Sequence, residues 1–160
     1  MYNQAYKVTA LELADYVLYK SVQDKRLISN LQLQKILYYI QVKCLQEGFV
    51  AFEDKVEAWT HGPVVPIVYD KWKSYGAMTI AWYFFDKITV CPKIKEIADK
   101  MLETLRELNV WDLVELSHRG SWKKYEKFAS GFSGVEIKKE DIEKDKSYDT
   151  FYSEFRNKKD

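Results

Sequence analysis

The chain of 160 residues lacks most of the features that would assign it to a chemical class at first sight. Its two cysteines, Cys44 and Cys91, lie far apart and form no metal-binding or redox spacing, so we expect two reduced and mostly buried thiols. No apolar run approaches the roughly 20 residues that a membrane-spanning helix needs. The N-terminal stretch MYNQAYKVTALELADY carries Asp and Glu where a signal peptide would be apolar, so we expect a cytoplasmic protein without a membrane partner.

A surplus of charge of one sign is also missing. Lys and Arg number 25 against 24 Asp and Glu, which gives a net charge of +1. This balance provides no global field to attract nucleic acid, so we do not expect nucleic acid as the main partner. The length fits one compact domain, which we expect to span residues 1–160.

Catalytic and cofactor-binding signatures are scarce as well. The sequence contains no G-x-S-x-G, no phosphate-binding glycine loop and no HExxH, and we predict no cofactor and no metal site. Only His61 and His118 titrate near neutral pH without help from their surroundings. A small enzyme that uses these two histidines in one cleft is therefore one alternative.

A nucleic-acid-binding regulator is a second alternative, and it rests on HRGSWKKYEK at residues 118–127. Basic side chains that alternate with Trp122 and Tyr125 can hold a strand by phosphate contact and base stacking. Glu126 interrupts the cluster, which makes a solvated helix face the simpler interpretation. The basic residues are Arg119, Lys123, Lys124 and Lys127.

Aromatic residues, in contrast, are abundant: they make up 16% of the chain, with 12 tyrosines. Tyr and Trp are enriched at binding hot spots because they combine a large rigid surface with one polar group. The composition therefore favours a protein that binds other macromolecules.

Two capping boxes mark the first two helices. Thr9 with Glu12 begins one helix, and Ser29 with Gln32 begins the next. In the second helix an apolar face formed by Leu33, Ile36, Leu37 and Ile40 is expected to face the core. Gln34, Lys35 and Tyr38 fall largely on other faces, so we expect them to be exposed and available to a partner.

The rest of the chain alternates helices with a small β element. Residues 49–59 predict a short extended segment, and the β-branched and aromatic stretch 79–90 predicts a strand that pairs with it. Between them Gly62 and Pro63 make a tight corner that leads into a helix at Pro66. Further helices are expected after Pro92, from a cap at Asp112 with Glu115 as its box partner, and as a terminal helix over 146–160. The predicted fold class is mainly α, with a small β-hairpin or short sheet.

Three stretches together resemble a known family. ISNLQLQKILYYIQ, then EAWTHGPVVPIVYDKWKSYG, then ELSHRGSW are similar in content and order to the SocA-like antitoxin family, also called the Panacea domain. The resemblance runs from about residue 9 to residue 145. It implies a mostly helical, non-enzymatic domain of bacteria and their phages that neutralises a neighbouring toxin by binding it. The founding type also hands its toxin to a cytoplasmic protease, so a protease is a second expected partner.

The family's motif residues carry over individually. The helix motif falls on Leu33, Gln34, Lys35, Leu37, Tyr38 and Tyr39, the corner motif on Ala58, Trp59, Gly62, Pro63, Val64, Pro66 and Tyr69, and the later tryptophan on Trp122. Two departures stand out: HRGSW lacks the proline usual before this tryptophan, and His61 replaces an aromatic residue usual before Gly-Pro. The resemblance therefore gives His61 no family-wide role.

From these observations we predict which motif residues contact the toxin and which support the fold. The predicted toxin-binding residues are Gln34, Lys35, Tyr38, Trp59 and Val64. The predicted structural residues are Leu33, Leu37, Tyr39, Ala58, Gly62, Pro63, Pro66, Tyr69 and Trp122.

Overall fold

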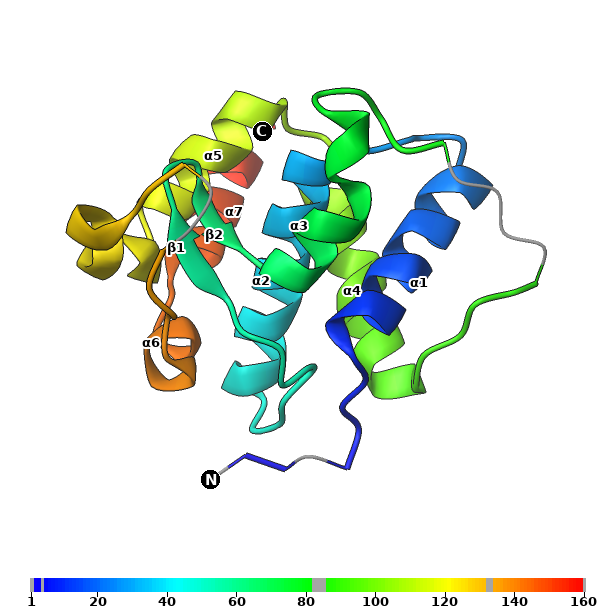
Figure 1. Cartoon of the computed structure of the whole chain (residues 1–160), viewed down its shortest axis with the longest axis horizontal. Coiled ribbons are helices and arrows are strands. Elements are labelled where there is room, and N and C mark those ends of the chain that lie inside the picture. The colour runs from blue at the N-terminus through cyan, green and yellow to red at the C-terminus, as the bar shows by residue number, and fades with distance from the viewer. Residues whose placement is uncertain (1, 4, 82–85, 132–133, 160) are drawn as a thin grey trace.

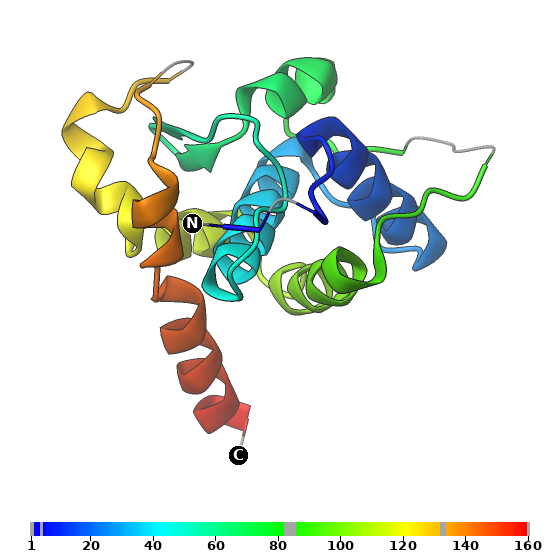
Figure 2. The ribbon, with the colours of Figure 1, turned by 90° about the horizontal axis from the view of Figure 1, so that it is seen from below.

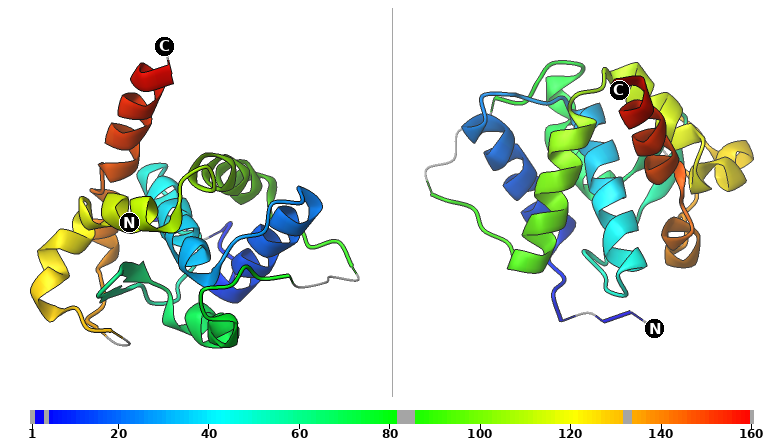
Figure 3. Two further views of the ribbon diagram at one scale, coloured as in Figure 1. Left: turned by 90° about the horizontal axis from the view of Figure 1, so that it is seen from above. Right: turned by 180° about the vertical axis from the view of Figure 1, so that it is seen from behind.

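Helix α2 (Asn30–Gln46) runs through the middle of the molecule, and most other helices pack against it (Figure 1). The computed structural model describes residues 2–3, 5–81, 86–131 and 134–159. Helices α3 and α4 lie on opposite sides of α2, as the view from above in Figure 3 shows. The surrounding helices are α1 (Ala10–Gln23), α3 (Pro66–Trp72), α4 (Pro92–Leu105), α5 (Val110–His118), α6 (Lys139–Glu143) and α7 (Ser147–Lys159). The predicted fold class, mainly α with a small β element, is confirmed.

Both predicted capping boxes are present. The Thr9 hydroxyl accepts the Glu12 N–H, and the Glu12 carboxylate accepts the Thr9 N–H. Ser29 and Gln32 make the same reciprocal pair at the start of α2. Each box satisfies two backbone donors that the first turn of a helix leaves without a partner, which fixes where α1 and α2 begin.

Prolines open α3 and α4, as predicted. Pro66 and Pro92 each occupy the first helical position, where a missing N–H costs no hydrogen bond. Helix α3 is short and continues into a 3-10 turn, η1 (Lys73–Tyr75), after which Gly76 adopts a φ of 57°. Helix α3 therefore begins at Pro66 as predicted, but Gly62 and Pro63, the expected corner, belong to a strand.

The pairing of the small sheet differs from the prediction. Strand β1 (Glu57–Trp59) pairs antiparallel with β2 (Gly62–Val64), which we had expected to be only a connection. The described residues of the predicted strand 79–90 form no strand, only a bridge from Thr79 to Ser29; residues 82–85 of that stretch lie outside the described part. The outer edge of β1 is already occupied, since the Ala58 N–H donates to the carbonyl of Val135 at 2.9 Å, so the stretch has no edge to join there.

Helix α5 begins three residues earlier than predicted. The side chain of Asn109 caps it by accepting the Asp112 N–H at 2.9 Å, so the predicted cap at Asp112 and its box with Glu115 are wrong. Asn and Asp are comparably strong caps, so the sequence offers two starts three residues apart. The earlier start places Trp111 in the first turn of α5, beside the hairpin turn.

The C-terminal helix α7 projects from the body of the protein (Figure 2). Its first turn is anchored, because Tyr148 is buried and its ring lies 6.0 Å from that of Tyr39 in α2. Phe151 and Phe155 then continue a half-buried stripe along it. Among the described helices, none combines the length and the apolar character that a bilayer span requires.

Gly62 is where the hairpin approaches the interior most closely. Its φ is 105°, and a Cβ at this position would lie 3.0 Å from the Lys35 Nζ and closer still to the Ser117 hydroxyl. Gly48 also has a positive φ, of 88°, but a Cβ there would meet nothing within 4 Å. Comparing substitutions at the two glycines therefore distinguishes the cost of the positive φ from the cost of steric overlap.

We expect Gly48→Ala to lower the free energy of unfolding by about 1–2 kcal/mol, from the positive φ alone. Gly62→Ala should cost about 1–3 kcal/mol more, because Lys35 and Ser117 must also move. Urea unfolding of both variants at one pH measures the difference. Equal losses would show that the space above Gly62 is not tight.

Candidate functional site

The inner edge of the hairpin is held by side chains of α2, not by a third strand. The Val65 N–H donates to the Gln34 Oε1 at 2.8 Å, and the Lys35 Nζ donates to the Pro63 carbonyl at 2.9 Å. Gln34 is held in turn by Asn30, whose Oδ1 accepts from the Gln34 Nε2 at 2.9 Å. The helix motif and the corner motif of the sequence therefore bind each other directly.

The predicted exposure of Gln34, Lys35 and Tyr38 is wrong, because all three side chains are fully buried. The polar ends bond to neighbouring segments instead of to water: Tyr38 donates to the Asp145 carboxylate at 2.5 Å. Their face of α2 is covered by the hairpin and by the segment that follows α6. In this fold Gln34 and Lys35 hold the corner from inside, and Tyr38 holds the segment that follows α6. Their part in toxin binding stays a prediction.

Lys35 is a buried ammonium group without a carboxylate partner among the described residues. Its Nζ donates to the Pro63 carbonyl, and burial lowers the pKa of Lys35 to about 7. Desolvation disfavours the charged form of an amine, which is the direction of this change. Lys35 is therefore close to half neutral near physiological pH.

The predicted structural residues lie in the interior or in the hairpin and the start of α3. Leu33, Leu37 and Tyr39 are fully buried on α2, and the Tyr39 hydroxyl lies 2.6 Å from the Ser147 hydroxyl. Trp122 is buried and donates its indole N–H to the Trp59 carbonyl at 2.8 Å. The remaining motif positions, Ala58, Gly62, Pro63, Pro66 and Tyr69, form the hairpin and the start of α3.

Trp59 and Val64 are mostly buried, but both face a hollow at the surface. We name this hollow the corner groove; it has a volume of about 680 Å³ and a predominantly apolar lining. Its walls come from the start of α2, the hairpin, α3 with the turn that follows it, and the start of α5. The lining residues used below are Gln32, Gln34, Trp59, His61, Val64, Tyr69, Lys73 and Trp111.

Aromatic side chains give the corner groove its shape. The rings of Trp59 and Tyr69 meet edge to face with centroids 4.9 Å apart, and the Trp59 indole N–H donates to the Glu57 carboxylate at 3.0 Å. At the rim Trp111 is 62% exposed and meets His61 edge to face at 5.3 Å. Met78 lies in the chain between two further lining residues, Ala77 and Thr79, and is 71% exposed. A large apolar area is thus open to solvent at this one place.

The two histidines do come near each other, at the hairpin turn. His118 stacks on Trp122 with ring centroids 4.0 Å apart, and its Nε2 lies 3.1 Å from the Thr60 carbonyl. Burial, reinforced by the charge of Lys35, lowers the pKa of His118. His61 lines the corner groove, whereas His118 does not. Among the described residues no cluster of three His, Cys, Asp or Glu side chains could hold a metal ion.

Of the two cysteines, Cys44 is not suited to act as a nucleophile. Both are free; Cys44 is buried and Cys91 is half-buried. Burial raises the pKa of the Cys44 thiol to about 12, which leaves it protonated and unreactive.

The basic cluster at 118–127 does not form a stacking surface. Trp122 and Tyr125 are buried, so neither ring can receive a base. Lys124 pairs with Asp141 at 3.1 Å, and Arg119 pairs with Glu115 at 2.6 Å.

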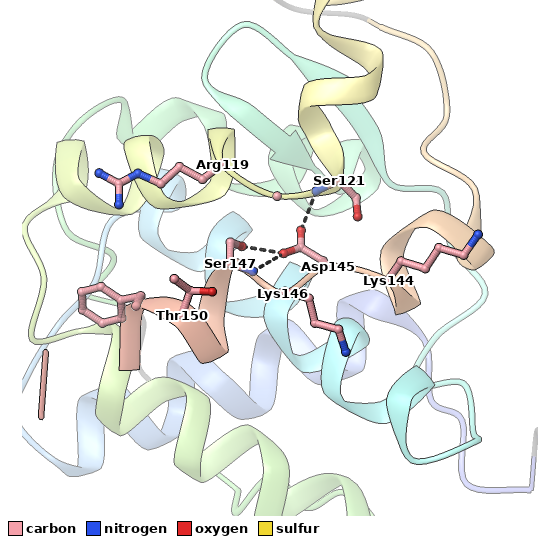
Figure 4. A pocket seen from close by; sticks show the side chains of 9 residues that line it. Arg119, Ser121, Lys144, Asp145, Lys146, Ser147 and Thr150 are labelled. Carbon is pink, nitrogen blue, oxygen red and sulfur yellow. Dashed lines mark hydrogen bonds between the residues drawn. The ribbon is translucent and has the colours of Figure 1, made fainter. Parts of the chain in front are cut away.

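A second hollow lies over the Asp145 carboxylate (Figure 4). Four hydrogen bonds satisfy this carboxylate: they come from the Tyr38 hydroxyl, the Ser121 N–H, and the N–H and hydroxyl of Ser147. Arg119, Lys144 and Lys146 line the same hollow, yet their charged ends point away from the carboxylate. The Asp145 carboxylate therefore connects three segments at the start of α7, and the basic side chains of this hollow do not converge on one point where a ligand could bind.

Comparison with known proteins agrees with the motif pattern. A family model described as "Antitoxin SocA-like, Panacea domain" matches residues 33–123. Among curated proteins, Antitoxin SocA of Caulobacter vibrioides (strain NA1000 / CB15N) is 32% identical over 129 residues, covering 72% of this chain and 69% of that protein. No solved structure matches the chain significantly. The matched region contains α2 from Leu33 onward, the hairpin and all of α3 to α5.

The lowered pKa of Lys35 predicts a pH-dependent stability. Unfolded lysine titrates near 10.4, so between about pH 7 and that value the unfolded chain binds more protons and the free energy of unfolding rises with pH. From about pH 7 to about pH 8.5 the rise due to Lys35 should be about 1.5 kcal/mol. Urea unfolding should show this rise in the native chain and lack it in Lys35→Met.

The comparison stays below about pH 8.5 because Cys44, with its raised pKa, acts in the opposite direction above its unfolded pKa. Lys35→Met also leaves the Pro63 carbonyl without its donor, so it should be less stable at every pH. Only the change with pH tests the argument. Parallel curves for the two proteins would mean that Lys35 keeps an ordinary pKa in the fold.

Proposed function

Because the chain belongs to the SocA-like antitoxin family with its Panacea domain, we propose that it is a proteic antitoxin that neutralises a cognate toxin by binding it directly, and that the toxin occupies the corner groove. The proposed role is not catalytic. Delivery of the bound toxin to a cytoplasmic protease stays a prediction from the family resemblance.

The observation that carries the choice of surface is the exposed aromatic rim of a preformed apolar groove. Binding hot spots are enriched in Trp and Tyr and lie in or beside pockets that exclude water. Trp111 is largely exposed, while Trp59 and Tyr69 form the wall behind it. An apolar side chain of the toxin that enters here would bury Trp111 together with the groove wall.

Three of the five predicted toxin-binding residues, Gln34, Trp59 and Val64, line the corner groove. Lys35 and Tyr38 act behind the wall, through Pro63 and Asp145. We therefore propose a division of roles. The groove residues contact the toxin, and the buried polar residues of α2 hold the groove in shape.

A rigid groove also lowers the cost of association. Ordering a flexible loop on binding consumes part of the interaction free energy. Here the hairpin is fixed on both edges, by Gln34 and Lys35 on one side and by the Val135 carbonyl on the other. The toxin would meet a surface that needs little rearrangement.

We expect Trp111→Ala to abolish or strongly reduce toxin neutralisation without unfolding the protein, since the side chain is largely exposed. Toxin affinity should fall by about 2 kcal/mol, as at other aromatic hot spots. The toxin to test is the product of the adjacent reading frame. Growth rescue on co-expression and titration calorimetry with the purified proteins give the two measurements, with a melting curve for each variant.

Tyr6→Ala is the matched control, because Tyr6 is also an exposed aromatic residue but lies in the N-terminal segment, outside the groove lining. It should retain neutralisation. Loss of rescue in both variants, or in neither, would argue against the corner groove. Failure of the native chain to rescue growth would count against the antitoxin role itself.

The enzyme alternative makes the opposite prediction for the two histidines. His61→Gln and His118→Gln keep a polar side chain but remove the imidazole that acid–base catalysis would need. We expect each variant to neutralise the toxin within about threefold of the native chain. Loss of neutralisation in both, with toxin affinity and melting temperature unchanged, would favour catalysis.

A further inference from the structure

The corner groove is poor in negative charge. None of its described lining residues is an Asp or Glu, although the chain contains 24 of them. Among the described lining residues, the side chain with a positive charge is that of Lys73. Protein interfaces are complementary in charge, so a partner that covers this positively charged groove is expected to place negative groups against it.

Hydrogen-bond donors are also in surplus at the groove. The side-chain oxygen of Gln32 is used by the Ser29 N–H at 2.8 Å, while its amide NH₂ donates to no other described residue. The oxygen of Gln34 is used by the Val65 N–H at 2.8 Å. The side-chain amide oxygens of the wall are therefore occupied, and an amide donor at the rim is left for a ligand that accepts hydrogen bonds.

Two carboxylates beside the groove, those of Glu57 and Asp70, do not cancel the charge of Lys73. Glu57 is outside the lining and accepts from the Trp59 indole at 3.0 Å. Asp70 pairs with Lys73 at 3.6 Å, but both side chains are about two-thirds exposed, at 67% and 61%. A pair this exposed contributes little and can exchange, so Lys73 can turn to a carboxylate on a partner.

We propose that the occupant of the corner groove is an acidic segment of the toxin that carries a large apolar side chain next to one or more carboxylates. This rests on the proposed function and specifies the partner's chemistry. The apolar side chain packs between Trp59, Val64 and Trp111, and the neighbouring carboxylate pairs with Lys73. His61 and the Gln32 amide add donors along the same rim.

A random-peptide display selection against the full-length chain tests this directly. We expect the enriched peptides to place Trp, Phe or Leu within two or three residues of Asp or Glu. A synthetic copy of the most enriched peptide should then bind the native chain, and Trp111→Ala should weaken it about tenfold or more. Lys73→Glu should weaken it about fivefold to tenfold.

A charge swap makes the test specific. Replacing the peptide's carboxylate residues with lysine should weaken its binding to the native chain and restore its binding to Lys73→Glu. Lys100→Glu is the control with the same change in net charge: Lys100 is exposed on α4, which lies on the side of α2 opposite to α3. It should leave the affinity unchanged. Melting curves confirm that each variant is folded.

Several results would overturn the proposal: no enriched peptide, peptides without an acidic preference, or equal affinity for Lys73→Glu and Lys100→Glu. Binding of a fluorescein-labelled single-stranded DNA 20-mer that Lys73→Glu abolishes would also overturn it, in favour of an anionic strand. The antitoxin role is judged separately, by growth rescue with the adjacent reading frame. Rescue that Trp111→Ala abolishes and Lys73→Glu leaves intact would keep the groove and reject the acidic partner.

Discussion

A helix that is covered on every side can keep polar side chains only if each one finds a partner, and α2 is built on this constraint. Two of its buried polar residues, Gln34 and Lys35, satisfy backbone groups on the inner edge of the hairpin. Leaving such groups without partners in the interior would cost about 1–3 kcal/mol each. The pair therefore does what a third strand would do, and the two-stranded sheet needs no further strand on that side.

The same constraint applies to the next turn of α2. Tyr38, one turn further along α2, donates to the Asp145 carboxylate, which also accepts from Ser121 and Ser147. One buried carboxylate thus joins α2, the start of η2 (Ser121–Phe128) and the start of α7. Burying a charge is expensive unless it is fully hydrogen-bonded, and here each oxygen accepts two bonds. Segments far apart in sequence are fixed by a single group.

The sequence predicted the elements whose causes are local. Thr9, Ser29, Pro66 and Pro92 act within one helical turn, so their effects can be recognised without the fold. The exposure of α2 could not be predicted in the same way. An amphipathic interpretation assumes that polar residues face water, but here Gln34, Lys35 and Tyr38 bond to groups at least 28 residues away in the sequence. No local pattern indicates such a partner.

The candidate site likewise has a part that the sequence predicted and a part that it did not. The motif residues that the resemblance identified are mostly interior, because they are the ones that must meet each other: Lys35 with Pro63, Gln34 with Val65, Trp122 with Trp59. Two groove-lining residues that the sequence prediction did not select, Trp111 and Lys73, lie outside those motif positions and come from separate elements.

Nothing inside the molecule fixes the identity of an exposed rim residue, since its side chain satisfies no buried group. His61, which departs from the family pattern, is one of these rim positions. The residues at the rim of the groove can therefore change while the buried residues keep the fold. We infer that substitutions at the rim can change which partner binds without loss of the fold.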